Sequence, residues 1–493
     1  SAVQRFEQRR SLAAPKRIAS RLAVADGAMA KGTPLLTPPM SSVKSHSRGE
    51  EDLAVYLPEP ADAGPLAHVG SAGMFTAVSN VVLSVLGAGQ LVLPYAMKEL
   101  GLGVGLTALL LFTALSVHSL HTLTVYELHF TPNPKDCIES YAELVIRVLG
   151  TWGNRICALL LALYAWGGAL SFMVIVKSEL PVLVSLLGME ASGVNLLIAD
   201  AVFIILPLCS LSDVSLLKKC APMGCIAAIM VTVVVCCSTP WGVFSVASWE
   251  EEACQGPADV AGNVNAQGSA PLGQIRWWPS SFTGVAATLP LLSFALNSSW
   301  AYIPILCTLK EKSSRRTWTL INASNAVILA NYVLLAFNGY AMFCDRTEAN
   351  VLDSLEVSSS VWVLIARALV AVQLTLALPM RFFVARRTVG EQLGIGDSAL
   401  GRAALAFALV ASATVLAIMP LSLATVLGIT SSVCASMIIY ILPSLVDLML
   451  HSKVPVPQSR VRLLGSCISL VVGSFILVAG TLANMLGIAP AAA

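Results

Sequence analysis

The chain has 493 residues, of which 56% are hydrophobic and 12% are charged, and its formal net charge is +2. A soluble domain carries about 25% charged residues, so this composition excludes a soluble globular protein and indicates one that crosses a membrane several times. The small net charge provides no field that would attract nucleic acid.

The first 70 residues are predicted to be a disordered cytosolic tail, because they are polar and contain several prolines and mixed charges. No apolar core of the signal-peptide type occurs there. The beginning of the tail is rich in Arg, Ala and Ser, which leaves an organelle transit peptide open as an alternative. Residues 71–490 are predicted to form the transmembrane domain.

The apolar segments after the tail predict an all-α polytopic membrane protein with about 11 spans, each of roughly 20 residues. We place the spans at 74–98, 102–126, 153–179, 194–211, 221–246, 281–307, 318–343, 359–384, 402–419, 421–449 and 463–487.

Basic residues predict the orientation of these spans. If the N-terminus is cytosolic, the outer loops contain four basic residues, Lys98, Lys177, Arg276 and Arg346. The cytosolic loops then contain sixteen basic residues, including Lys312 and Arg381. Cytosolic loops are enriched in Lys and Arg, so this asymmetry favours a cytosolic N-terminus and an extracellular or lumenal C-terminus.

The first span is interrupted. Gly87-Ala88-Gly89 lies near its middle and Pro94 follows shortly after. Glycine and proline weaken a helix, and broken backbone at membrane depth survives only where it is buried in protein or lines a cavity. In secondary transporters such breaks hold substrate and ion. The alternative is that the small residues only allow another helix to pack closely.

The sixth span has a second interruption, with Pro290 followed by Asn297-Ser298-Ser299. Spans 1 and 6 occupy corresponding positions in two halves of five spans, and such a pair indicates an inverted-repeat transporter with its site at the midplane.

The two breaks suit an amino acid in its zwitterionic form. Free amides at the start of the second half of span 1 would face a carboxylate, and released carbonyls would accept bonds from an ammonium group. The predicted substrate-binding residues are Val85, Leu86, Gly87, Ala88, Gly89, Gln90, Ser293, Phe294, Asn297 and Ser298.

Three further polar residues inside spans are candidates for ion coupling, namely Asn80, Thr375 and Asp200. Asp200 either has a structural role or takes up and releases a proton during transport. The Thr375 hydroxyl faces either an ion or its own helix. Arg367 is predicted to lie in the outer half of span 8, where it either snorkels to the interface, forms a structural pair or acts at a gate.

No enzyme is expected, because the chain lacks the common hydrolase, metalloprotease and nucleotide-binding motifs. No metal site or cofactor is expected either, since the 12 cysteines include no Cys-x-x-Cys pair.

The chain resembles the amino acid/auxin permease family, which includes vacuolar amino acid transporters and sodium-coupled neutral amino acid transporters. Four stretches carry the resemblance: Leu86–Ala96, Leu206–Asp213, Ala366–Arg381 with Thr375 and Pro379, and Val426–Ser431 with Pro443.

The resemblance implies a LeuT-like fold, with a 5+5 inverted repeat and one extra helix, and carriage of amino acids by alternating access. Sodium-coupled members place an Asn where this chain has Leu83, so coupling to protons, or none, is favoured over sodium. Family members often join outer loops by a disulfide, which would pair Cys254 with Cys344, although both could be free thiols.

The predicted function is therefore secondary active transport of amino acids across a lipid bilayer, either the plasma membrane or a vacuolar or lysosomal membrane. A receptor that senses amino acids is one alternative. A carrier of another small cationic metabolite, such as a polyamine, is another.

Overall fold

The computed structural model describes residues 72–131, 138, 140–186, 188–211, 221–239, 254, 274–310, 312–357, 360–395, 398–451 and 460–486. All of them lie within one compact unit, Val55–Ala493. The predicted tail, 1–70, lies outside the described residues.

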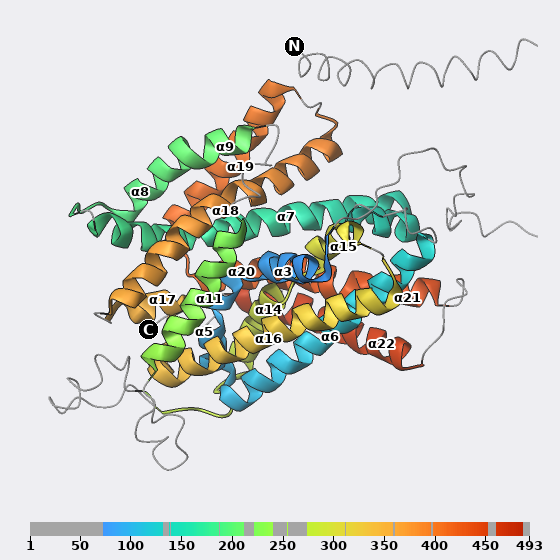
Figure 1. Ribbon diagram of the computed structural model, residues 1–493, viewed down its shortest axis with the longest axis horizontal. Helices are drawn as coiled ribbons and strands as arrows, with labels where there is room; N and C mark the ends of the chain where they lie inside the picture. The colour runs from blue at the N-terminus through green and yellow to red at the C-terminus, as the bar shows by residue number, and fades with distance from the viewer. Residues whose placement is uncertain are drawn as a thin grey trace, which may run out of the picture. The chain divides into compact units, whose positions relative to one another are not determined.

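Helices account for nearly all of the described residues (Figure 1). The first half of the chain contains α3 (Met74–Val85), α4 (Ala88–Leu91), α5 (Leu93–Leu100), α6 (Leu102–Phe130), α7 (Tyr141–Ser185), α8 (Gly193–Asp200), η1 (Ala201–Ile205), α9 (Leu206–Ser210) and α11 (Ala221–Ser238). The second half contains α14 (Phe282–Ala295), α15 (Ser299–Thr308), α16 (Ser314–Phe343), η3 (Cys344–Arg346), α17 (Val351–Ser354), η4 (Leu355–Val357), α18 (Val361–Leu393), α19 (Ala399–Ile418), α20 (Leu423–Thr430), η5 (Ser431–Ile441), α21 (Leu442–Leu450), α22 (Arg460–Phe475), η6 (Ile476–Gly480) and α23 (Thr481–Met485).

These helices match the predicted spans closely. Nine of the described helical segments are long and apolar enough to cross a membrane, and the bent pair Met74–Val85 and Ala88–Leu100 makes a tenth. The fifth predicted span begins as α11, whose apolar part, Ile226–Ser238, is short, and its continuation lies outside the described residues. The exact count of eleven therefore stays a prediction.

Serine side chains mark where several of the long helices begin. The hydroxyl oxygens of Ser140, Ser281, Ser313, Ser398 and Ser422 each accept a hydrogen bond from the backbone amide three residues later. Such caps satisfy one of the amides that the first helical turn leaves free, and each contributes about 1 kcal/mol. Polar residues at the ends of apolar segments thus fix the limits of the helices.

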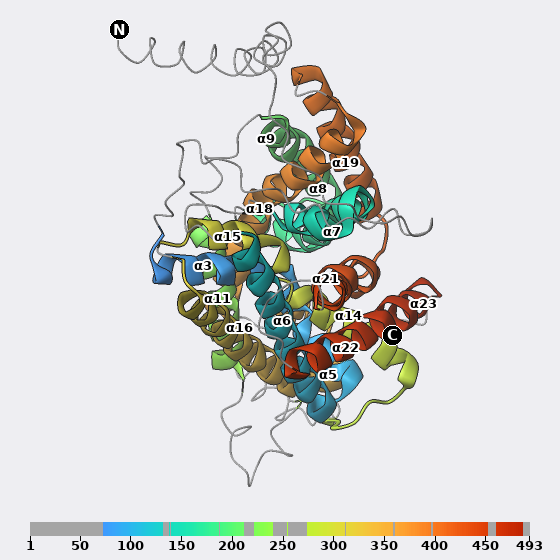
Figure 2. The same cartoon turned by 90° about the vertical axis from the view of Figure 1, so that its right-hand side faces the viewer.

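The two interrupted spans lie side by side and run in opposite directions (Figures 1 and 2). The second half of span 6, α15, packs against α3, whereas its first half, α14, packs against α4 and α5. The backbone also joins the start of span 1 to the end of span 6, because the Ala72 amide donates to the Thr308 carbonyl (2.9 Å) and the Lys310 amide donates to the Ala72 carbonyl (3.0 Å). This antiparallel arrangement brings both breaks to the same depth.

The remaining helices support this pair. The long helices α7 and α18 pack along each other, with α19 against both of them. Figure 2 shows α22 beside α6 and α21, at the edge of the bundle. Large apolar side chains on the outer helices are exposed, among them Phe203, Leu400 and Val471. An exposed apolar surface of this kind is suited to hydrocarbon.

A buried ion pair links α7 to α18. Arg367 Nε donates to Glu179 Oε2 at 2.7 Å, and Asn350 Nδ2 donates to the other carboxylate oxygen at 3.3 Å. Of the roles expected for Arg367, the structure shows the pair. Asn350 also donates a hydrogen bond to Asp353 at 3.0 Å, and burial raises the pKa of the Asp353 carboxyl.

A disulfide joins Cys254 to Cys344, with Cα atoms 5.3 Å apart.

The buried pair generates a stability prediction. Arg367→Leu leaves the Glu179 charge unpaired, which costs about 3–5 kcal/mol, so we expect a clearly lower melting temperature for the purified protein in detergent. Removing both charges, in Glu179→Leu/Arg367→Leu, should restore part of that loss.

The matched control is Arg387→Leu on the same helix. Arg387 pairs with Glu391 at 2.8 Å on the exposed surface, and such a pair contributes at most about 1 kcal/mol. Equal losses of melting temperature in Arg367→Leu and Arg387→Leu would contradict this account.

Candidate functional site

Span 1 breaks at Leu86 and Gly87. The Leu86 amide closes the last turn of α3 on Val82, and Gly87 is fully extended, with φ 178° and ψ −145°. The chain bends by 57° before Ala88 opens the second half of the span. Since the first amides of a helix have no partner within it, the backbone at Ala88 and Gly89 presents free donors at the bend.

Span 6 breaks between Leu296 and Ser298, where short polar side chains replace the apolar run. Asn297, Ser298 and Ser299 are 2%, 0% and 0% exposed. Their side-chain oxygen and nitrogen atoms form no well-aligned hydrogen bond. The Tyr164 hydroxyl faces the side-chain amide of Asn297, but the two groups are not aligned for a hydrogen bond. A buried polar group without a partner costs about 1–3 kcal/mol, so this concentration of them indicates a binding site.

The two breaks are in direct contact. A methyl group placed at Gly89 would lie 2.8 Å from Ala295 Cα and 3.2 Å from the Phe294 ring. A side chain from a third helix joins them as well, because the Tyr332 hydroxyl lies 3.3 Å from the Val85 carbonyl oxygen and 2.8 Å from the Ala295 carbonyl oxygen.

The neighbouring glycine is less confined. A methyl group at Gly87 would meet only the Phe172 ring, at an ordinary contact distance of 3.6 Å. The close approach of the two spans therefore depends on Gly89.

Aromatic side chains surround the breaks. The Tyr164 and Phe294 rings lie 5.2 Å apart, Phe172 lies against Gly87, and the Tyr440 hydroxyl faces Ser293. A partly open cavity adjoins them, lined by Leu161, Tyr164, Ala165, Trp300, Met380, Arg381 and Val384. The structure thus groups the predicted residues of span 6 with those of span 1.

Gln90 belongs to the scaffold around this group. Its side chain is 2% exposed, donates to the Ala228 carbonyl on α11 at 3.3 Å and accepts from Asn331 on α16 at 3.3 Å. Both hydrogen bonds tie the second half of span 1 to its neighbours, so the Gln90 amide is already occupied.

The structure brings two of the three ion-coupling candidates together. The Asp200 carboxyl on α8 faces the Thr375 hydroxyl on α18, and the two residues are 5% and 9% exposed. Asp200 Oδ2 has no well-aligned hydrogen bond. Asn80 is exposed on α3 and so does not join them.

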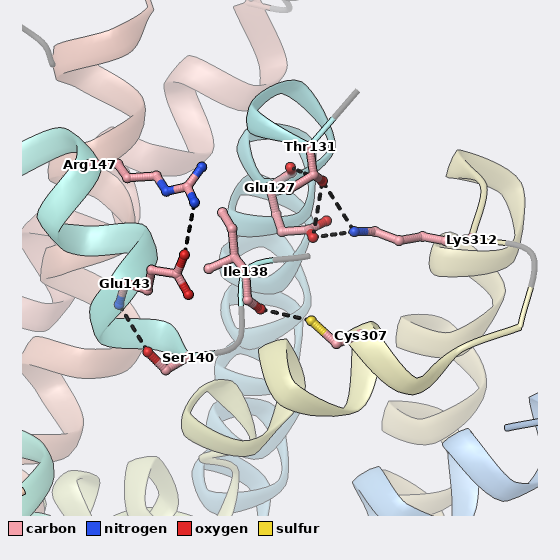
Figure 3. Close-up of polar contacts among 8 residues, drawn as sticks. All are labelled: Glu127, Thr131, Ile138, Ser140, Glu143, Arg147, Cys307 and Lys312. Atoms are coloured by element: carbon pink, nitrogen blue, oxygen red, sulfur yellow. Dashed lines mark hydrogen bonds and ion pairs between the residues drawn. The ribbon is translucent and has the colours of Figure 1, made fainter. Parts of the chain in front are cut away.

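Polar contacts also hold one end of the bundle together, at the side predicted to be cytosolic (Figure 3). Lys312 forms an ion pair with Glu127 on α6 and donates to the Thr131 hydroxyl at 3.2 Å. Both partners in the ion pair are buried, with side-chain exposures of 6% and 1%. The Cys307 sulfur at the end of α15 lies 2.8 Å from the Ile138 carbonyl oxygen, just before α7. This cluster closes α6, α15 and the start of α7 against one another.

Sequence reasoning missed several residues at the site. Tyr332 and Tyr164 lie within regular helical stretches of α16 and α7, away from the breaks of spans 1 and 6, and carried no signal. Arg381 was counted among the basic residues at the cytosolic end of span 8; the structure places it within α18, which continues to Leu393, and on the lining of the cavity.

Comparisons with known proteins identify the family of the chain. Residues 70–486 match the model of a family described as transmembrane amino acid transporter protein. Sodium-coupled neutral amino acid symporter 2 of Danio rerio is 24% identical over 84% of this chain and 82% of its own length.

Two solved transporter structures are similar to this chain, and the first of them shares its fold. The nucleobase-cation-symport-1 family transporter MHP1, in a closed conformation with bound bromovinylhydantoin, has a TM-score of 0.50 and 13% identity, over 88% of this chain and 95% of its own. MhsT in complex with L-phenylalanine has a TM-score of 0.47 and 12% identity, over 85% and 98%.

The contact between the breaks generates a prediction. Gly89→Ala forces a methyl group onto the Ala295 backbone, and overpacking of this kind costs about 1–3 kcal/mol, so the melting temperature should fall by several degrees. Gly73→Ala is the matched control, since a methyl group there would meet nothing within 4 Å. Equal melting temperatures for the two variants would show that the breaks do not touch.

Proposed function

Because the chain belongs to the family of transmembrane amino acid transporter proteins, we propose that it carries its substrate through the point where spans 1 and 6 break. It is a multi-pass membrane protein of the transporter class and not an enzyme. The proposal concerns where the amino acid binds, how the path closes and which ion drives the transport.

The backbone at the two breaks supports binding of a zwitterion. Free amides at Ala88 and Gly89 are donors for the substrate carboxylate, and they lie at the positive end of the helical segment that follows. Carbonyl groups released near Leu86 are acceptors for its ammonium group. Only the glycine at position 89 lets span 6 approach close enough to complete the site.

The single observation that carries the proposal is the group Asn297, Ser298 and Ser299. Three consecutive polar side chains are buried at the break of span 6 without well-aligned partners. An amino acid backbone offers both donors and acceptors, so its binding would repay the desolvation of these groups.

Alternating access requires that the path be closed on one side at a time. The ion pair of Glu127 with Lys312 and the backbone pairing of Ala72 with Leu309 hold α3, α6 and α15 together at the predicted cytosolic end. We expect these contacts to separate when the site opens toward the cytosol, with the N-terminus on the cytosolic side as the basic residues indicate.

Coupling to protons, or no coupling, is the proposal for the driving ion. Sodium needs several oxygen ligands, but Leu83 offers none and Asn80 is exposed on α3. Asp200 instead supplies a buried carboxyl that faces the Thr375 hydroxyl, so a proton can be taken up and released there. The relative from Danio rerio is named a sodium-coupled symporter, which makes this point the first to test.

Transport by the purified protein tests the binding site. In proteoliposomes, Asn297→Ala should raise the KM for amino acid uptake about tenfold, because one lost hydrogen bond to a charged group is worth about 1.5–3 kcal/mol. Asn195→Ala is the matched control, since Asn195 is exposed on α8.

Two results would count against the proposal. Equal KM values for Asn297→Ala and Asn195→Ala would place the site elsewhere. Amino acid binding without any uptake by the wild-type protein would favour a sensing receptor over a carrier.

The driving ion has its own test. Replacing sodium with choline should leave amino acid flux within about twofold, whereas a pH gradient should change it more, and Asp200→Asn should remove the effect of the gradient. A steep, saturable dependence on sodium at fixed pH would overturn the proposal and make Thr375 and Asn80 the next residues to examine.

A further inference from the structure

One arginine lies beside the breaks. The Arg381 guanidinium on α18 is 4.3 Å from the centroid of the Phe172 ring, and a methyl group at Gly87, at the break of span 1, would lie 3.6 Å from the far edge of that ring. Tyr164 lines the same cavity as Arg381 and packs on Phe294 in the last turn before the break of span 6. Aromatic rings therefore lie between the charge and each break.

Arg381 differs from the other basic residues inside the spans. Arg367 binds Glu179, Arg386 donates to backbone carbonyls of α9 and its C-terminal end, and Lys177 donates to the Ala417 carbonyl at 2.7 Å. Among the described residues, none forms a hydrogen bond or an ion pair with Arg381, whose contact with Phe172 is a cation–π interaction. A cation at membrane depth is costly when it has no anionic partner.

The fold makes room for this charge. A methyl group at Gly168 on α7 would overlap Arg381 Nη1, so the glycine at position 168 leaves space for the guanidinium. The guanidinium borders the cavity that Tyr164 and Met380 also line. Trp300, which lies next to the polar break of span 6, lines the same cavity.

We propose that Arg381 binds a carboxylate of the transported amino acid, in a second subsite between α7, α15 and α18. The planar guanidinium matches a carboxylate with two parallel hydrogen bonds, and its positive charge would then gain the partner that the protein does not supply. The carboxylate is either the α-carboxylate of any substrate, on its way past α15, or the side-chain carboxylate of an acidic amino acid. This inference rests on the proposed function and extends it to a second position along the path.

The test is counterflow of radiolabelled alanine and glutamate in proteoliposomes, with a melting curve for each variant. Arg381→Gln should raise the KM at least tenfold, and Arg381→Lys should lie between it and the wild type, because a lysine keeps the charge but loses the paired geometry. Arg387→Gln, exposed on the same helix, should behave as the wild type does. Gly168→Ala should weaken binding as well, because its methyl group displaces the guanidinium.

The substrates identify the source of the carboxylate. Equal losses for alanine and glutamate assign Arg381 to the α-carboxylate, and a loss confined to glutamate assigns it to the side chain. The melting temperature of Arg381→Gln should not fall, since the substitution removes an unpaired charge.

Three results would overturn the inference. They are KM values within twofold of the wild type for both substrates in Arg381→Gln, a wild-type KM in Gly168→Ala, and an Arg381→Gln protein that melts earlier or does not fold, which would make the arginine structural. Absence of counterflow in the wild type would instead reject the proposed function itself.

Discussion

The structure depends on one constraint, namely that backbone groups at membrane depth must be satisfied inside the protein. The helical hydrogen bonding of spans 1 and 6 is interrupted, and contacts between the two interruptions compensate for this. Gly89 lets span 1 reach the Ala295 backbone, and the Tyr332 hydroxyl is shared between carbonyls of both spans. At the break of span 6, the side chains of Asn297, Ser298 and Ser299 stay without aligned partners, and we propose that an amino acid binds there.

The surrounding helices hold the broken pair in place. The long helices α7 and α18 are tied by the buried Glu179–Arg367 pair, far along the chain from the breaks. At the opposite end, the contacts of Lys312 and Ala72 join the halves of spans 1 and 6 that lie on the predicted cytosolic side. Long packed helices beside two half-helices that polar contacts hold at one end are an arrangement suited to transport by alternating access.

Much of the fold was predictable because hydrocarbon imposes length and composition on each span. The positions of ten predicted spans and of both breaks follow from apolar runs interrupted by Gly, Pro, Asn and Ser. Side-chain direction was not predictable, since it depends on neighbours distant in sequence. Gln90 therefore proved to be bound between α11 and α16, Asn80 proved to be exposed, and Arg381 proved to lie inside α18. Tyr332 could not be found at all, because nothing in α16 marks its contact with the two breaks.

The central claim is that one amino acid binds between the two breaks, and a structure of the purified protein with a transported amino acid bound would test it most directly. We expect density for the ligand between Gly87–Gly89 and Asn297–Ser299, with its carboxylate toward the free amides of the second half of span 1. Density in which the ligand contacts neither break would contradict the account.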